Sequence, residues 1–202
     1  MTPDTYHHGD LPNSLRAAAA EVLTEDGVAG FSLREVARRA VVSHAAPAHH
    51  FGDAAGLLTA VAIDGFTYLA DQTEAAIVGV DDPVEAMICV GRAYVAVSLD
   101  RPGHCAVLFR KDAVHADDQQ YGEAGDRAFG VLLGVVQRLA DERAPELNVM
   151  LASQLCWASM QGLVGLHATM VELGGRHGLE VPAITDLAEA FTRQIVDGFL
   201  PR

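Results

Sequence analysis

Apolar residues recur every three or four positions along most of this chain, and no run of alternating Val, Ile or Thr between tight turns predicts a strand. In the first apolar segment Leu11 and Leu15 fall on one helical face, and Gly27 closes the segment. Asp10 stands where a helix cap is expected, and Pro12 is tolerated in a first turn. The pattern predicts a helix that begins after Asp10 and ends before Gly27.

Two shorter helices are predicted next. Ser32 and Glu35 have the spacing of a capping box, in which the Ser side chain accepts an amide proton and the Glu side chain reaches back. That helix should end near Ala40. Ser43 is expected to cap the second short helix, which runs to about His50 although Pro47 would remove one of its backbone hydrogen bonds.

Longer helices are predicted for the rest of the chain. Asp53 is expected to cap a fourth helix, whose apolar face runs from Leu57 to Leu69. Further helices are expected over residues 83–99, 104–110, 119–142, 145–174 and 183–199. The sequence therefore predicts an all-α protein of about nine helices, with three helices at the N-terminus followed by a helical bundle.

Composition supports a folded protein outside the membrane. Half of the 202 residues are hydrophobic, which is enough to bury a core and argues against disorder. No stretch of eighteen or more residues lacks charged and polar side chains, so no membrane span is expected. The first residues contain neither the basic region nor the apolar run of a secretory signal, so we expect a cytoplasmic protein.

The net charge of −13 argues against a general affinity for nucleic acid, but the charge is unevenly distributed. Residues 1–60 contain four Arg and seven acidic residues, whereas the remaining residues contain ten basic and twenty acidic ones. Five of the nine His also fall within residues 1–60. Cys89, Cys105 and Cys156 are scattered and form no CxxC pair, which favours buried thiols over a disulfide framework or a zinc site.

The two short helices, joined by a three-residue turn and packed on an amphipathic helix, are typical of a helix-turn-helix. In this motif the second short helix projects from its support into the DNA major groove. Its first residues must be free for phosphate and base contacts.

Residues 7–58 also resemble the N-terminal domain of TetR-family regulators. The resemblance rests on Gly27, Gly30 and Phe31-Ser32-Leu33, on Val36 to Ala40, on Val42-Ser43, and on His50-Phe51-Gly52-Asp53 followed by Leu57-Leu58. The Ser43 to Pro47 string and the later Trp157-Ala158 resemble a subgroup with a WHG-type C-terminal domain.

This resemblance implies a function for each part of the chain. Residues 1–52 would form the DNA-binding domain, and residues 53–202 would bind a ligand and form the dimer. Residues 43–50 would be the recognition helix. The implied DNA contacts are Ser32, Arg34, Ser43, His44, Ala45, His49 and His50.

Three departures from the family pattern weaken the implied DNA contacts. Val41 replaces a glycine of the turn, Ala48 replaces an aromatic residue, and Ala54 replaces a basic residue. Because phosphate contacts supply much of the affinity for DNA, we expect weak binding. The alternative is a small-molecule sensor on the same fold that has lost its DNA function.

Aromatic and sulfur-containing residues of the C-terminal part are candidates for a ligand cavity near Trp157. They are Met87, Tyr94, His104, Phe109, Trp157, Met160, Gln161 and His167. The alternative for each residue is ordinary core packing. The related subgroup usually has His at the position of Gln161, so that contact is not simply carried over.

No catalytic motif is present, and we expect neither an enzyme nor a cofactor. Neighbouring His49 and His50 point about 100° apart on a helix, so they are not expected to share a metal ion. His7 and His8 are likewise not expected to bind one.

Together these features predict a ligand-responsive regulator, most simply a repressor that a small molecule releases from a palindromic DNA operator. The apolar faces of the last two helices predict a homodimer. Their larger and smaller apolar residues are Leu151, Leu155, Ala158, Gly162, Gly165, Ala168, Leu187, Phe191, Ile195 and Phe199.

Overall fold

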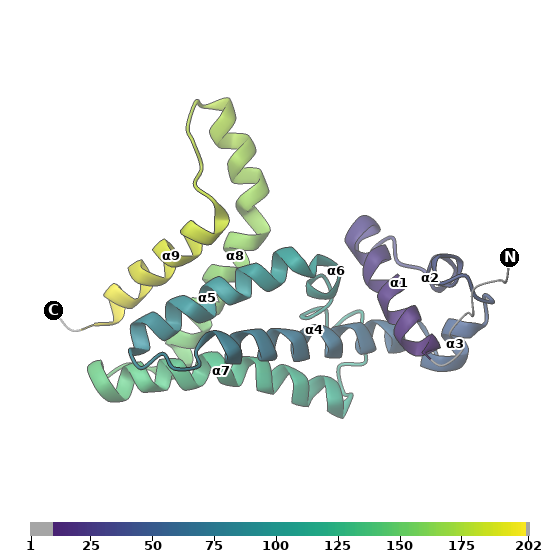
Figure 1. Cartoon of the computed structure of the whole chain (residues 1–202), viewed down its shortest axis with the longest axis horizontal. Helices are drawn as coiled ribbons and strands as arrows, with labels where there is room; N and C mark the ends of the chain where they lie inside the picture. Colours follow the sequence, from purple (N-terminus) through teal and green to yellow (C-terminus); the bar gives the residue numbers. More distant parts are fainter. Residues whose placement is uncertain (1–9, 201–202) are drawn as a thin grey trace, which may run out of the picture. The chain divides into compact units, whose positions relative to one another are not determined.

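A computed structural model of the chain describes residues 10–200, so His7 and His8 lie outside the described residues. Within that range the chain forms nine helices and no strand (Figure 1). The helices are α1 (Leu11–Asp26), α2 (Leu33–Arg39), α3 (Ala46–Phe51), α4 (Ala54–Ala76), α5 (Pro83–Asp100), α6 (Pro102–Cys105), α7 (Gln119–Arg143), α8 (Val149–Arg176) and α9 (Ile184–Phe199). The all-α prediction and the number of helices are confirmed.

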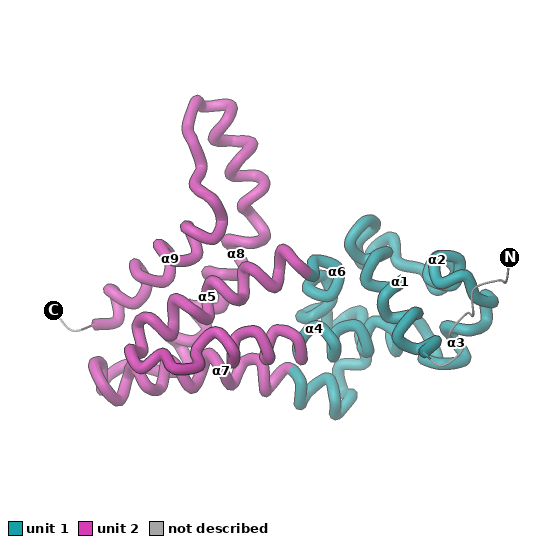
Figure 2. The backbone as a smooth tube through the Cα atoms, viewed as in Figure 1, with its two compact units in different colours: residues 1–66, 101–124 teal, residues 67–100, 125–202 magenta. Residues whose placement is uncertain are grey.

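The chain folds into two compact units (Figure 2). Unit 1 consists of residues 1–66 and 101–124, and unit 2 of residues 67–100 and 125–202. The compact unit that contains α1, α2 and α3 therefore also includes the first part of α4, all of α6 and the start of α7.

Unit 1 has its own core, in which α1, α2 and α4 bury apolar side chains. Leu15, Val36 and Leu57 are fully buried, one from each of these helices. Helix α6 packs against α1, where a Cβ atom added to Gly103 would lie 2.0 Å from the carbonyl oxygen of Ala20. This close approach of two backbones requires glycine at position 103.

Three predicted helix boundaries were wrong, each next to a proline. Helix α3 begins at Ala46 instead of Ser43, and α6 is Pro102–Cys105 instead of residues 104–110. In both cases the proline falls in the first turn, where its missing N–H is not needed. Helix α8 begins at Val149 instead of Pro145, because the Asn148 side chain accepts a hydrogen bond from the Leu151 amide.

Two predicted caps were also wrong. Ser43 does not cap α3, because the cap position of this helix is Ala45 and no side chain caps it. Asp10 occupies the cap position of α1, but its side chain makes no capping hydrogen bond. Its backbone carbonyl instead accepts a hydrogen bond from the Ser14 hydroxyl.

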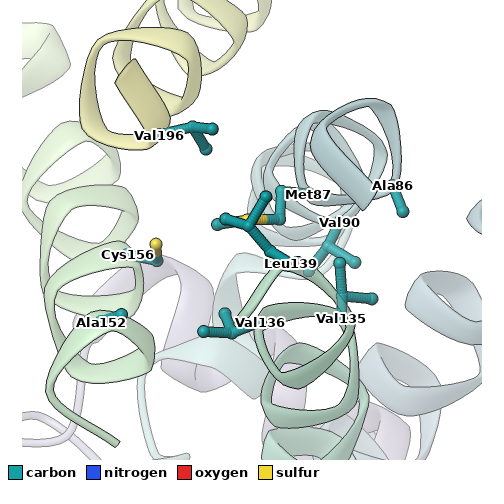
Figure 3. Packing of buried hydrophobic residues seen from close by; sticks show 9 residues of the cluster. All are labelled: Ala86, Met87, Val90, Val135, Val136, Leu139, Ala152, Cys156 and Val196. Carbon is teal, nitrogen blue, oxygen red and sulfur yellow. The ribbon is translucent and has the colours of Figure 1, made fainter. Parts of the chain in front are cut away.

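The core of unit 2 lies among α5, α7, α8 and α9 (Figure 3). Its members are Ala86, Met87, Val90, Val135, Val136, Leu139, Ala152, Cys156 and Val196. Burial raises the pKa of the Cys156 thiol to about 11, so this cysteine is an unreactive core residue. A second cluster joins Val95 of α5 to Met160 and Leu163 of α8 and to Ile184 and Ala188 of α9.

Helix α8 keeps an apolar face that no other part of the described chain covers. Leu151, Leu155, Leu166 and Met170 are all exposed on it. By length and composition alone, α8 is the one helix among the described residues that is long and apolar enough to cross a membrane. An exposed apolar face of this size marks an interaction surface.

Candidate nucleic-acid interface and ligand groove

Helix α2 begins as its capping residues predict. The Ser32 hydroxyl accepts a hydrogen bond from the Glu35 amide at 3.2 Å, which confirms the first half of the capping box. The Glu35 carboxylate instead accepts hydrogen bonds from Arg38 at 2.6 Å and from Arg39 at 2.9 Å. The bonds from Arg38 and then Arg39 lower the pKa of Glu35 to about 2.

The arginines of α2 differ in how much positive charge they can offer to DNA. Arg39 pairs with Glu25 of α1 at 2.6 Å as well as with Glu35. Arg38 shares the Glu35 carboxylate. Arg34 is exposed and has no ion pair within residues 10–200, so it is the cation of α2 that is available to a phosphate.

The turn between α2 and α3 has an unusual backbone conformation at Val41. Its φ is 56°, the left-handed region, and its side chain is 72% exposed. A β-branched residue is strongly disfavoured there, whereas glycine adopts this conformation freely. The departure from the family pattern at Val41 therefore leaves the turn intact but places it under strain.

Helix α3 has one buried residue, two half-buried residues at its ends and three exposed residues. Pro47 is buried, whereas Ala48, His49 and His50 are exposed. The His49 and His50 rings contact each other edge to face, with centroids 5.3 Å apart. The seven predicted DNA contacts fall on the start of α2, the turn and α3, and all seven are exposed.

Asp53 lies between α3 and α4, and the sequence predicted only one of its two side-chain contacts. Asp53 caps α4 as expected, since its carboxylate accepts a hydrogen bond from the Gly56 amide at 2.8 Å. This bond is the main reason that the pKa of Asp53 is lowered. Oδ1 of Asp53 also lies 3.1 Å from Nε2 of His115. The helical pattern of the sequence could not predict this contact, because His115 lies in a loop.

The eight predicted ligand contacts do not gather in one place. Met87 lies in the first core cluster of unit 2 and Met160 in the second, whereas His104 and Phe109 belong to unit 1. Phe109 packs against Phe66, with ring centroids 5.6 Å apart. Burial lowers the pKa of His104.

Three other members of that set make side-chain contacts within unit 2. The Tyr94 hydroxyl donates a hydrogen bond to Gln161, which joins α5 to α8. The ring of Trp157 lies against that of Phe129 of α7, with centroids 5.1 Å apart. Trp157 is thus half-buried between two helices.

The last member, His167, lines a groove of about 640 Å³ formed by α8, the segment 177–183 and α9. Most of its walls are apolar, with Leu166, Met170, Leu179 and Phe191 among them. Nδ1 of His167 is buried and has no hydrogen-bond partner. Apart from His167, no predicted ligand contact lines this groove, because those predictions followed aromatic residues and most of the lining is aliphatic.

The part of the chain that the structure describes contains no group of three or more His, Cys, Asp or Glu side chains that could hold a metal ion.

Family models match both parts of the chain. The model described as "Bacterial regulatory proteins, tetR family" matches residues 15–61, which include the whole of α2, α3 and the turn. The model described as "Tetracyclin repressor-like, C-terminal domain" matches residues 87–197. No curated protein matches the sequence.

Solved structures with the same fold include three informative examples. A Rhodococcus sp. RHA1 protein described as having unknown function is 28% identical, with a TM-score of 0.80 over 98% of this chain and 100% of that chain. PfmR of Thermus thermophilus, described as a TetR family transcriptional regulator, is 20% identical, with a TM-score of 0.72 over 93% of this chain and 99% of that chain. FadR of Bacillus subtilis, a transcriptional regulator in complex with stearoyl-CoA, is 17% identical, with a TM-score of 0.74 over 92% of this chain and 98% of that chain. At the last two identities the likeness concerns the fold alone.

Proposed function

The chain belongs to the TetR family of bacterial regulatory proteins, and on that basis we propose that it is a cytoplasmic repressor that a small molecule releases from a palindromic DNA operator. The family and the fold support a DNA-binding transcriptional regulator. We assign DNA binding to residues 1–52, and ligand binding and dimerisation to residues 53–202.

The observation that carries this proposal is the exposed helix α3 on a capped helix-turn-helix. A recognition helix must be held firmly at one point and leave its remaining surface to the major groove. Pro47 supplies the anchor, and His49 and His50 supply polar side chains on the free surface. Arg34 at the exposed start of α2 supplies a phosphate contact.

Dimerisation is supported by the uncovered apolar surfaces of α8 and α9. Leu155 on α8 is 48% exposed, and Phe191 on α9 is 41% exposed. Two copies that bring these helices together would bury them in a four-helix interface. Such a dimer has two-fold symmetry, which is why we propose a palindromic operator.

The ligand proposal rests on the groove beside His167. Its volume lies within the range of small-molecule sites, and its apolar walls with one unsatisfied imidazole nitrogen suit an apolar molecule that carries a polar group. FadR holds an acyl ligand, stearoyl-CoA, on the same fold. Because the chain shares only the fold with FadR, the ligand class is taken from the groove itself.

A ligand in this groove would contact both α8 and α9, the helices that we propose join the two subunits. A ligand that binds one dimer arrangement better than another shifts the population toward it. The spacing of the two recognition helices would then change, and the operator would be released.

Selection of binding sites from random DNA with the purified protein tests this proposal. We expect an enriched palindromic motif. An absence of enrichment at low salt would contradict the repressor proposal and favour a sensor without DNA function. The strained Val41 and the neutralised Arg38 and Arg39 are the observations that favour this second function.

A further inference from the structure

We propose that DNA binding by this chain is coupled to protonation of His44, His49 and His50, so that its affinity for DNA rises as the solution becomes more acidic. This inference rests on the proposed DNA-binding function. It concerns which side chains supply the positive charge that meets the phosphates.

Arginine supplies little of that charge. Of the four arginines in residues 10–66, Arg16 pairs with Asp64 at 2.6 Å, and Arg38 and Arg39 pair with Glu35. Arg34 is the one that has no ion pair within the described residues. No Lys or Arg occurs in the sequence between Arg39 and Arg92. Helix α3, the turn before it and the start of α4 therefore contain no permanent cation.

Histidines take the place of those cations. His44 lies in the turn just before α3, and His49 and His50 lie in its last turn. All three are exposed, and the residues between them, Ala45 to Ala48, carry no charge. Phosphates on either side of a major groove would therefore meet imidazole groups at both ends of α3.

The acids on the elements around α3 are already engaged elsewhere. On α2, Glu35 accepts bonds from two arginines, and on α1, Glu25 and Asp26 lie within 2.6 and 4.0 Å of Arg39. At the start of α4, Asp53 is bound by the Gly56 amide and by His115. Within residues 10–200, none of these carboxylates makes an ion pair with His44, His49 or His50. Bound phosphate is thus the anion available to stabilise a charged imidazole at α3.

The direction of the effect follows from linkage. Histidine is the side chain that ordinarily changes charge between about pH 5 and pH 8. A neighbouring phosphate favours the charged form, so the complex binds more protons than the free protein. Each proton taken up on binding makes the affinity about tenfold tighter for each pH unit of acidification in the titrating range. Acid therefore strengthens binding, and alkali weakens it.

Fluorescence anisotropy with a labelled duplex tests the inference at constant ionic strength between about pH 8 and pH 6. We expect wild-type affinity to be at least about tenfold higher at the acidic end, with a steeper dependence on salt because more phosphates are neutralised. Circular dichroism at each pH checks that the protein stays folded, which matters because burial lowers the pKa of His104.

Variants separate the three histidines from the rest of the chain. The triple variant His44→Gln, His49→Gln, His50→Gln should lose the pH dependence. The variant His49→Arg, His50→Arg should bind tightly at alkaline pH and depend less on pH than wild type. The control His115→Gln removes an exposed histidine of unit 1 that lies outside α2, α3 and the turn between them, and it should keep the wild-type dependence.

Equal affinity of the wild type at both ends of the pH range would overturn the inference while leaving the proposed function in place. A triple variant that keeps the full pH dependence would also overturn it. If the wild type binds no DNA at either pH in low salt, the proposed function itself fails.

Discussion

In unit 1, Val41 determines the backbone strain of the turn, and Gly103 determines how closely α6 packs against α1. Val41 holds a left-handed conformation in the middle of the helix-turn-helix, at the position where the family pattern has glycine. The sequence could predict this site, because the missing glycine is visible in the pattern. The close approach at Gly103 could not be predicted, because it depends on which helix α6 packs against.

Val41→Gly should stabilise the protein. Left-handed backbone costs an ordinary residue about 1–2 kcal/mol, and the extra unfolded-state freedom of glycine offsets about 0.5–1 kcal/mol of the gain. We expect a rise of roughly 0.5–1 kcal/mol in the free energy of unfolding, measured by urea denaturation. Val78→Gly is the matched control, since Val78 is also highly exposed and does not have a positive φ. If Val41→Gly lowers the free energy of unfolding as much as Val78→Gly does, the backbone at Val41 is not strained.

Gly103→Ala should destabilise the protein. The added Cβ atom would lie 2.0 Å from the Ala20 carbonyl oxygen, so α6 must move away from α1. Overpacking of this kind costs about 1–3 kcal/mol, which thermal unfolding would detect as a lower midpoint. The control is Gly130→Ala on α7, where nothing lies within 4 Å and alanine favours the helix. An unchanged midpoint for Gly103→Ala would show that α1 and α6 are not held together in this way.

At the scale of elements, the helix starts capped by Ser32 and Asp53 were predicted correctly, whereas those of α3, α6 and α8 were not. Ser32 and Asp53 fix their helix starts through hydrogen bonds, which a sequence pattern can indicate. Pro47 and Pro102 each moved a predicted start so that the proline entered the first turn. The apolar pattern continues across such positions, so it could not locate the boundary.

Glu35→Gln should strengthen DNA binding through α2. The substitution releases Arg38 from its ion pair, and Arg39 keeps Glu25. One more phosphate contact would raise the slope of log affinity against log salt by about 0.9. Anisotropy titrations at several salt concentrations would measure it, with the exposed Glu21→Gln on α1 as a charge-matched control. Identical slopes for the two variants would mean that Arg38 does not reach DNA.

At the scale of the whole molecule, periodicity predicted the all-helical fold but not which helices become neighbours. The aromatic residues proposed for one cavity are divided between the two units, because sequence spacing says nothing about long-range packing. The groove beside His167 was missed for a related reason. Its lining comes from α8, α9 and the segment 177–183, and the sequence pattern had assigned Gly162, Leu187 and Phe191 of this lining to the dimer interface.

Leu155→Glu should break the proposed dimer. Burying an unpaired carboxylate in an apolar interface is strongly unfavourable. Because Leu155 is half exposed in the single chain, the substitution should leave each subunit folded. Light scattering at micromolar concentration should show a dimer for wild type and a monomer for the variant, with unchanged circular dichroism.

The control for this test is Gln154→Glu, which adds the same carboxylate to α8 in place of an exposed polar side chain and removes no apolar surface. This control should remain a dimer. A monomeric wild type would contradict the proposed interface.

The central claim is that the start of α2 and helix α3 bind DNA, and a salt titration of binding to a selected site tests it most directly. Wild type is compared with Arg34→Ala and His44→Ala. Arg34→Ala should weaken binding to all sequences alike and reduce the salt slope by about 0.9, the value of one neutralised phosphate, because a phosphate contact carries no base information. His44→Ala should weaken binding too, with a change in preferred sequence if its ring also reaches a base edge. If both variants bind DNA with the affinity and the salt slope of the wild type, the assignment of DNA binding to this surface is contradicted.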